Sequence, residues 1–231
     1  MGLNGLNERD AEKEDKDRDI RTDFHMHILS HKYDTIGGVM LSPSQIFVVV
    51  DIETDGPAVG MHSMLSLAAV ATDAEKQIGQ FYRKLSPLEN AKQDPETMLF
   101  WSKNPEAWKE VTTDAQPIQT VMTDFCTWVT HLGKEEPIFV SSPIGLDYTF
   151  VSWYLYRFAP TNPFISNKNA LRTLDIRSYI AGLYGFSYDN SSRLKWPAKL
   201  MEGMPEHTHD ALEDAVGYAF LLGKMVSEHK T

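Results

Sequence analysis

The stretch that most constrains the fold is FVVVDIETDG, Phe47–Gly56, where four apolar residues run straight into two acids. Such a run predicts a strand that is buried on both faces. Because strand side chains alternate between faces, Asp51 and Glu53 share one side and Ile52 takes the other. Two carboxylates held so close repel each other, and a divalent cation with oxygen ligands would relieve the conflict. The alternative interpretation is a solvated strand end with a turn at Asp55–Gly56.

Around this strand the chain is organised as a charged tail followed by one folded domain. Residues 1–38 mix both charge signs with little apolar periodicity, which predicts a disordered tail, and residues 39–231 form the domain. Strands are expected at 46–53, 64–73, 77–85, 137–142 and 171–174, and helices at 95–110 (two short pieces), 117–132, 147–158, 175–183 and 211–226, with 185–208 mainly loop. This order predicts an α/β fold with a mixed central sheet flanked by helices.

Composition limits the class of protein. An apolar content of 42% is enough for a sizeable core. The single cysteine, Cys126, cannot form an intramolecular disulfide, which predicts a buried thiol and a cytoplasmic setting. No apolar run reaches the roughly 18 residues that a membrane span needs. The net charge of −10 says little about the partner, because bound cations would offset part of it.

A second signal lies near the C-terminus, in EHTHDALEDA, residues 206–215. Asp210 and Glu213 resemble a capping box that opens the last helix, which puts Asp214 in its first turn and His209 on the loop before it. A neutral imidazole there could take a proton from water near pH 7. The alternative is a surface histidine and an acid that merely complements the helix dipole.

A third signal is Asp147 in GLDYTFV, which follows the expected strand PIFVSS. We predict that it starts a helix whose aromatic residues belong to the core. An aspartate at a helix start is commonly an N-cap, so Asp147 alone does not indicate a ligand.

Together, DIETDG, GLDYTFV and HDALEDA resemble, in order and separation, the three motifs of the DEDD superfamily of 3′–5′ exonucleases, in its histidine (DEDDh) branch. The resemblance covers roughly residues 45–228. ETMLFWSKNPEAW is similar to the T-x-x-W-W block of a subgroup of bacterial 3′–5′ exoribonucleases and phage-type exodeoxyribonucleases, with Phe100 in place of the first tryptophan. The second motif departs from the common N-x-x-F-D, since Leu146 precedes the acid and Pro143 stands at the usual asparagine.

The resemblance implies a ribonuclease H-like fold and a two-metal hydrolysis of nucleic acid from a free 3′ end to nucleoside 5′-monophosphates. It implies that Asp51, Glu53, Asp147 and Asp214 bind two Mg²⁺ or Mn²⁺ ions, with Asp51 between them. His209 would act as general base on the attacking water.

Contacts to the substrate are predicted less directly. Main-chain groups that could line the 3′-terminal nucleotide belong to Thr54, Asp55 and Gly56. Phe100 and Trp101 could stack on a base or pack in the core. Lys195, on the loop that leads to His209, could contact phosphates or be a solvated loop charge.

Two other functions remain open from the sequence. One is a nuclease of the same fold that cuts internally, such as a ribonuclease H, which the histidine spacing disfavours. The other is a non-catalytic nucleic-acid-binding module, which the presence of all five motif residues disfavours. The sequence does not decide between RNA and DNA or fix the oligomeric state, so a homodimer stays open.

Overall fold

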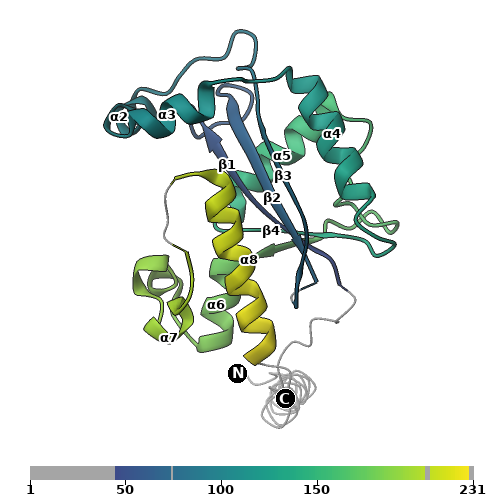
Figure 1. Ribbon diagram of the computed structural model, residues 1–231, viewed down its shortest axis with the longest axis vertical. Helices are drawn as coiled ribbons and strands as arrows, with labels where there is room; N and C mark the ends of the chain where they lie inside the picture. Colours follow the sequence, from purple (N-terminus) through teal and green to yellow (C-terminus); the bar gives the residue numbers. More distant parts are fainter. Residues whose placement is uncertain (1–44, 74, 206–208, 229–231) are drawn as a thin grey trace, which may run out of the picture. The chain divides into compact units, whose positions relative to one another are not determined.

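A five-stranded mixed sheet forms the centre of the computed structural model, which describes residues 45–73, 75–205 and 209–228. The predicted tail, 1–38, lies outside the described residues. The strands follow the order β3-β2-β1-β4-β5, and Figure 1 labels the first four strands of the chain, β1 to β4. They span Phe47–Thr54 (β1), Met64–Thr72 (β2), Gln77–Lys84 (β3), Ile138–Ser141 (β4) and Thr173–Asp175 (β5). The first three are antiparallel, whereas β4 runs parallel to both β1 and β5, which confirms the mixed α/β sheet.

Burial along the strands follows their place in the sheet. Every residue of β2 is buried because β2 lies between two other strands and is covered on both faces. The edge strand β3 is mostly exposed, with Phe81 as its buried residue. The predicted hairpin of 64–73 and 77–85 is therefore confirmed, with ends that differ by one residue.

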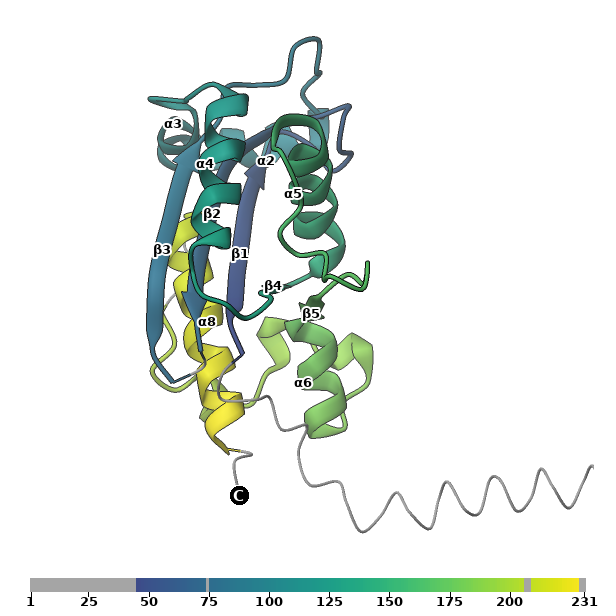
Figure 2. The same cartoon turned by 90° about the vertical axis from the view of Figure 1, so that its right-hand side faces the viewer.

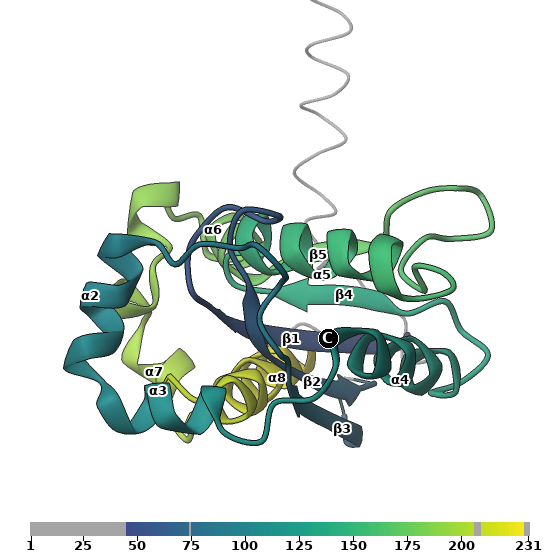
Figure 3. The same ribbon diagram turned by 90° about the horizontal axis from the view of Figure 1, so that it is seen from above.

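Strand β1 supplies side chains to two separate cores. Val48, Val50 and Ile52 pack in the core with α4 (Ile118–Thr130) and α5 (Ile144–Phe158). Phe47 and Val49 pack in the core with α6 (Ile176–Tyr184) and α8 (Ala211–Glu228). Helices α4 and α5 lie side by side (Figure 2), and Figure 3 shows α8 on the opposite side of the sheet. By alternation, Asp51 and Glu53 face the α8 side.

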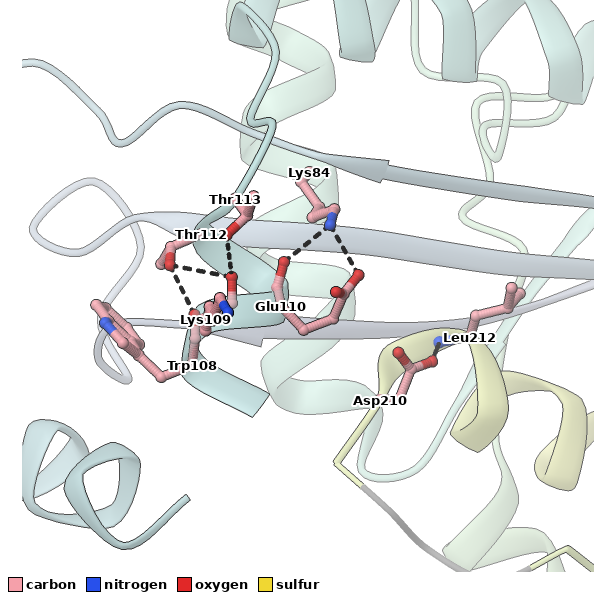
Figure 4. Close-up of polar contacts among 8 residues, drawn as sticks. All are labelled: Lys84, Trp108, Lys109, Glu110, Thr112, Thr113, Asp210 and Leu212. Atoms are coloured by element: carbon pink, nitrogen blue, oxygen red, sulfur yellow. Dashed lines mark hydrogen bonds and ion pairs between the residues drawn. The ribbon is translucent and has the colours of Figure 1, made fainter. Parts of the chain in front are cut away.

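Two short helices lie near the end of β1 that carries these acids. Helix α2 (Pro95–Lys103) has Pro95 in its first turn, and the Asp94 carboxylate accepts a hydrogen bond of 2.8 Å from the Thr97 N–H. Helix α3 (Pro105–Thr112) is held to β3, because Lys84 Nζ lies 2.7 Å from Glu110 Oε1 and donates to the Glu110 carbonyl (Figure 4). The predicted pair of proline-started helices is confirmed.

Helix α5 begins earlier than predicted, at Ile144 rather than at Asp147, so Asp147 lies inside the first turn. The Ile144 N–H donates to the Asp175 carboxylate at 2.9 Å. The first N–H groups of a helix have no partner within the helix, and here a side chain from a distant part of the chain accepts from one of them. The local sequence does not reveal this contact.

The segment 185–208, predicted as mainly loop, contains two 3₁₀ turns and a short helix: η1 (Tyr188–Asn190), η2 (Arg193–Lys195) and α7 (Ala198–Met201). Trp196 and Leu200 are buried against α8 and hold this segment on the sheet.

The helices of the described residues include none with the length and apolar character of a membrane span.

Candidate active site

Asp51 and Glu53 lie at the end of β1, where acids from three parts of the chain meet. Burial raises the pKa of Asp51 well above its ordinary value, and the charges of Asp147, Glu53 and Asp214 raise it further. Burial also raises the pKa of Glu53 to about 8, again with contributions from Asp214 and Asp147. The structure therefore brings the four predicted carboxylates into electrostatic reach of one another.

Asp147 enters this cluster from the first turn of α5, where its side chain is only 4% exposed. Burial raises its pKa to about 7, and the nearby Asp175 charge adds to the increase. The Ser141 side chain and the Ile52 N–H beside it act in the opposite direction. Asp175 also accepts from the Ser178 N–H at 2.6 Å, so it organises the starts of both α5 and α6. Local sequence reasoning missed the role of this acid at α5 because its bond to Ile144 spans 31 residues.

Asp214 enters from the first turn of α8 and is only 1% exposed. The turn is fixed by Asp210, whose Oδ1 accepts a hydrogen bond of 3.0 Å from the Leu212 N–H (Figure 4). The same oxygen accepts another of 3.0 Å from the Glu213 N–H. The predicted cap at Asp210 is confirmed. The charge of Asp210 also raises the pKa of Asp51 and of Glu53, so this capping residue contributes to the potential of the site.

His209 lies directly before Asp210 and has a left-handed backbone conformation, with φ of 59°. Its imidazole contacts Phe100 edge to face, with ring centroids 5.0 Å apart and an interplanar angle of 80°. The imidazole is therefore held between α2 and the start of α8, next in the chain to a carboxylate of the cluster.

The chemistry of these groups suits a hard divalent cation. Buried carboxylates that raise each other's pKa become more stable when a cation lies among them, and oxygen donors are the ligands that such ions take. Within residues 45–73, 75–205 and 209–228, no group of three or more His, Cys, Asp or Glu side chains is arranged so that it could hold a metal ion.

Trp101 corrects one of the predicted substrate contacts. Its side chain is only 2% exposed, and it packs with Leu65 and Val111. Its Nε1–H donates to the Thr54 carbonyl at 3.0 Å. The prediction that Trp101 stacks on a base is therefore wrong, because its ring is part of the core. Phe100 is 36% exposed, and its stacking on a base stays a prediction.

The segment after β1 is a rigid turn. The Asp55 carboxylate accepts from the Ser63 N–H at 2.5 Å, while its own N–H donates to the Ser63 carbonyl and its carbonyl accepts from the Asp94 N–H. These bonds hold the Asp55 main chain in place, and its contact with a nucleotide stays a prediction. A methyl group added to Gly56 would overlap the ring of His62. Main-chain contacts at Thr54 and Gly56 stay predictions.

Lys195 is engaged within its own loop, since its Nζ donates to the Asp189 carbonyl at 3.0 Å and to Asn190 Oδ1 at 3.1 Å. Its contact with phosphate stays a prediction.

Sequence reasoning missed Tyr218, one helical turn after Asp214. Burial raises the pKa of Tyr218, and the Asp51 charge raises it further, which places this phenol within electrostatic reach of the site. The spacing of four residues from Asp214 was the signal that could have found it.

The chain is similar to known exonucleases over most of its length. The model of the exonuclease family RNase_T matches residues 48–219. The 3′–5′ DNA exonuclease Cap18 of Escherichia coli is 30% identical over 181 residues, which cover 76% of this chain and 89% of Cap18.

Solved structures share the fold. The nuclease domain of 3'hExo, a DEDDh family member bound to rAMP, gives a TM-score of 0.60 at 13% identity, covering 80% of this chain and 92% of that domain. The zinc-bound complex of Escherichia coli ExoI with single-stranded DNA gives a TM-score of 0.58 at 18% identity, covering 80% of this chain and 41% of ExoI. These likenesses confirm the ribonuclease H-like fold.

Members of the family typically use divalent metal ions, which agrees with the oxygen donors at the end of β1. The family match reaches from the strand that carries Asp51 to the helix that carries Asp214. The chain therefore belongs to the exonuclease family and is a 3′–5′ exonuclease.

Proposed function

We propose that the chain hydrolyses the terminal phosphodiester bond of single-stranded nucleic acid or of 3′ overhangs and releases nucleoside 5′-monophosphates. The observation that carries this proposal is the convergence of acids from β1, α5 and α8 on one partly buried carboxylate, Asp51. Such a cluster is unfavourable by itself, so a role in binding cations accounts for its presence better than a role in stability does.

We infer that Asp51, Glu53, Asp147 and Asp214 hold two Mg²⁺ or Mn²⁺ ions. When bound, the ions supply Lewis-acid stabilisation of the negative charge that develops on the phosphodiester oxygens. The preference for these ions over softer metals rests on the all-oxygen donor set. Asp147 and Asp214 are buried side chains on helices, so two of the oxygen donors are already held in place. Few side chains therefore need to become ordered when the ions bind.

His209 acts in this proposal as the general base that takes a proton from the attacking water. A neutral imidazole suits this task near pH 7. His209 has a left-handed backbone, and Asp210 fixes the helix start next to it. In this proposal, main-chain groups of Thr54 and Gly56 contact the 3′-terminal nucleotide. The partly exposed Phe100 lies near that nucleotide.

DNA is the first substrate to test, because Cap18, the relative at 30% identity, is a DNA exonuclease. We also infer a cytoplasmic setting, which the single, buried Cys126 supports.

The experiment compares a 3′-labelled linear oligonucleotide with a circular one, as DNA and as RNA, in Mg²⁺, in Mn²⁺ and in EDTA. Stepwise release of nucleoside 5′-monophosphates from linear substrate, with the circle intact and with no activity in EDTA, is the expected result. Cleavage of the circle would support an internally cutting nuclease instead, and activity that survives EDTA would refute the role of the cations.

Variants of the cluster provide the second test. Asp51→Ala and Asp214→Ala should abolish turnover, whereas Glu89→Ala, which removes an exposed acid, should not change it. His209→Ala should reduce turnover by at least about 10²-fold, the usual contribution of a general base, with Mn²⁺ binding by calorimetry unchanged. Full activity of Asp214→Ala would contradict the assignment.

A further inference from the structure

Phe100 lies in contact with His209, the residue to which we assign proton transfer. The ring centroids are 5.0 Å apart, and the ring planes meet at 80°. This is the edge-to-face arrangement that aromatic pairs prefer, and it is favourable beyond the burial of area alone. The contact joins two segments that are far apart in the sequence, the middle of α2 and the residue before the capping residue of α8.

Phe100 is also linked, through Trp101, to the strand that carries the acids. Its neighbour Trp101 lies 5.2 Å away between ring centroids, with an interplanar angle of 69°. Trp101 in turn donates its Nε1–H to the carbonyl of Thr54, the last residue of β1. Trp108 of α3 packs against the same indole at 5.5 Å. An unbroken set of contacts therefore runs from the end of β1 through Trp101 and Phe100 to His209.

His209 needs such support because of its backbone. A φ of 59° is uncommon for a residue with a Cβ, and it persists where the surroundings fix it. The hydrogen bonds at Asp210 fix the main chain after His209. These hydrogen bonds act on the main chain, whereas the contact with Phe100 is made by the imidazole itself.

We propose that Phe100 is a positioning residue for the general base. Its ring fixes the orientation of the His209 imidazole relative to β1, the strand that bears Asp51 and Glu53. This inference rests on the proposed role of His209. It differs from the prediction that Phe100 stacks on a base, because a stacking residue acts on substrate affinity and a positioning residue acts on the rate of the bound complex.

The matched variants are Phe100→Leu, which keeps apolar volume but removes the ring, and Phe100→Tyr, which keeps the ring. Leu99→Ala is the control, because Leu99 is the exposed neighbour on the same helix. The first readout is the NMR signals of the His209 imidazole in EDTA, identified among the eight histidines by their loss in His209→Gln. The second is kcat and KM on a 3′-labelled single-stranded DNA oligonucleotide, together with binding of that oligonucleotide by an Asp214→Asn variant with and without Phe100→Leu.

We expect Phe100→Leu to shift the His209 signals and to lower kcat about 2- to 10-fold, the factor that corresponds to one aromatic pair contact. KM and oligonucleotide binding should stay unchanged, Phe100→Tyr should restore kcat, and Leu99→Ala should match the wild type. Unchanged His209 signals in Phe100→Leu would overturn the contact. A raised KM with weakened oligonucleotide binding and normal kcat would overturn positioning in favour of base stacking. A wild-type protein without nuclease activity would instead overturn the proposed function, which is a separate outcome.

Discussion

Replacing Glu53 by glutamine should stabilise the cation-free protein at alkaline pH, although this acid serves the site. Burial and the charges of Asp214 and Asp147 raise the pKa of Glu53 from 4.5 to about 8 in the folded protein. The unfolded chain releases this proton near pH 4.5, whereas the folded protein keeps it until about pH 8. The stability of the wild type must therefore fall as pH rises through this window and stay low above it.

The size of the effect follows from the same window. Each pH unit between the two pKa values costs about 1.4 kcal/mol, so an interval of about 3.5 pH units gives at most about 5 kcal/mol at pH 8. Glu53 retains some exposure to solvent, which screens the repulsion, so we expect about 2–4 kcal/mol. At pH 5, where the carboxyl is protonated in the folded protein, Glu53→Gln and the wild type should differ by less than about 1 kcal/mol.

The assay is urea unfolding in EDTA at pH 5, 6.5 and 8, followed by tryptophan fluorescence. Glu89→Gln is the control, because it removes the same charge from an exposed position. Added Mg²⁺ should raise the midpoint of the wild type more than that of Glu53→Gln, since only the wild type keeps all four acids. If the wild type and Glu53→Gln lost equal stability between pH 5 and pH 8, the electrostatic argument for the cluster would be refuted.

Three further substitutions test the structure around the site, each by urea unfolding at pH 7. Trp101→Ala should cost about 3–5 kcal/mol, as for a buried tryptophan, and a loss below about 1 kcal/mol would mean that the ring is not in the core. Tyr154→Phe leaves a buried main-chain N–H of β2 without its 2.8 Å acceptor and should cost about 1–3 kcal/mol; no change would contradict that bond. Gly56→Ala should cost about 1–3 kcal/mol because the methyl meets the His62 ring, whereas Gly145→Ala, with open space at its Cβ, should be neutral or stabilising. Equal effects of the two glycine changes would refute the close packing of Gly56.

The strands and helices nearest the acids were predictable because their signals are local. The apolar run before Asp51, the polar turn between the next two strands and the prolines that start α2 and α3 are each signals that span about ten residues or fewer. Strand alternation placed Asp51 and Glu53 on one face, whereas the choice of Asp147 and Asp214 as their partners rested on the family resemblance. Their convergence required the family resemblance, since no local rule brings three distant segments together.

What could not be predicted depends on contacts between distant parts of the chain. The sequence places Phe100 and Trp101 next to each other, but only the packing of α2 against β1 decides that Trp101 is buried and Phe100 partly exposed. The early start of α5 depends on a hydrogen bond to Asp175, which is 31 residues from Ile144. Tyr218 looks like a core residue in the sequence, and its reach to Asp51 exists only in the folded chain.

The two-sided packing of β1 has a consequence for how this chain can vary. Its even-numbered residues, Val48, Val50 and Ile52, fill the core with α4 and α5, and its odd-numbered residues fill the other core and then carry the acids. Inserting or deleting a single residue between Phe47 and Val50 would exchange the two sets. Both acids would then face the apolar core with α4 and α5, and Ile52 would face the side where the carboxylates had been. The spacing within β1 is therefore as strict a requirement for catalysis as the identity of the acids.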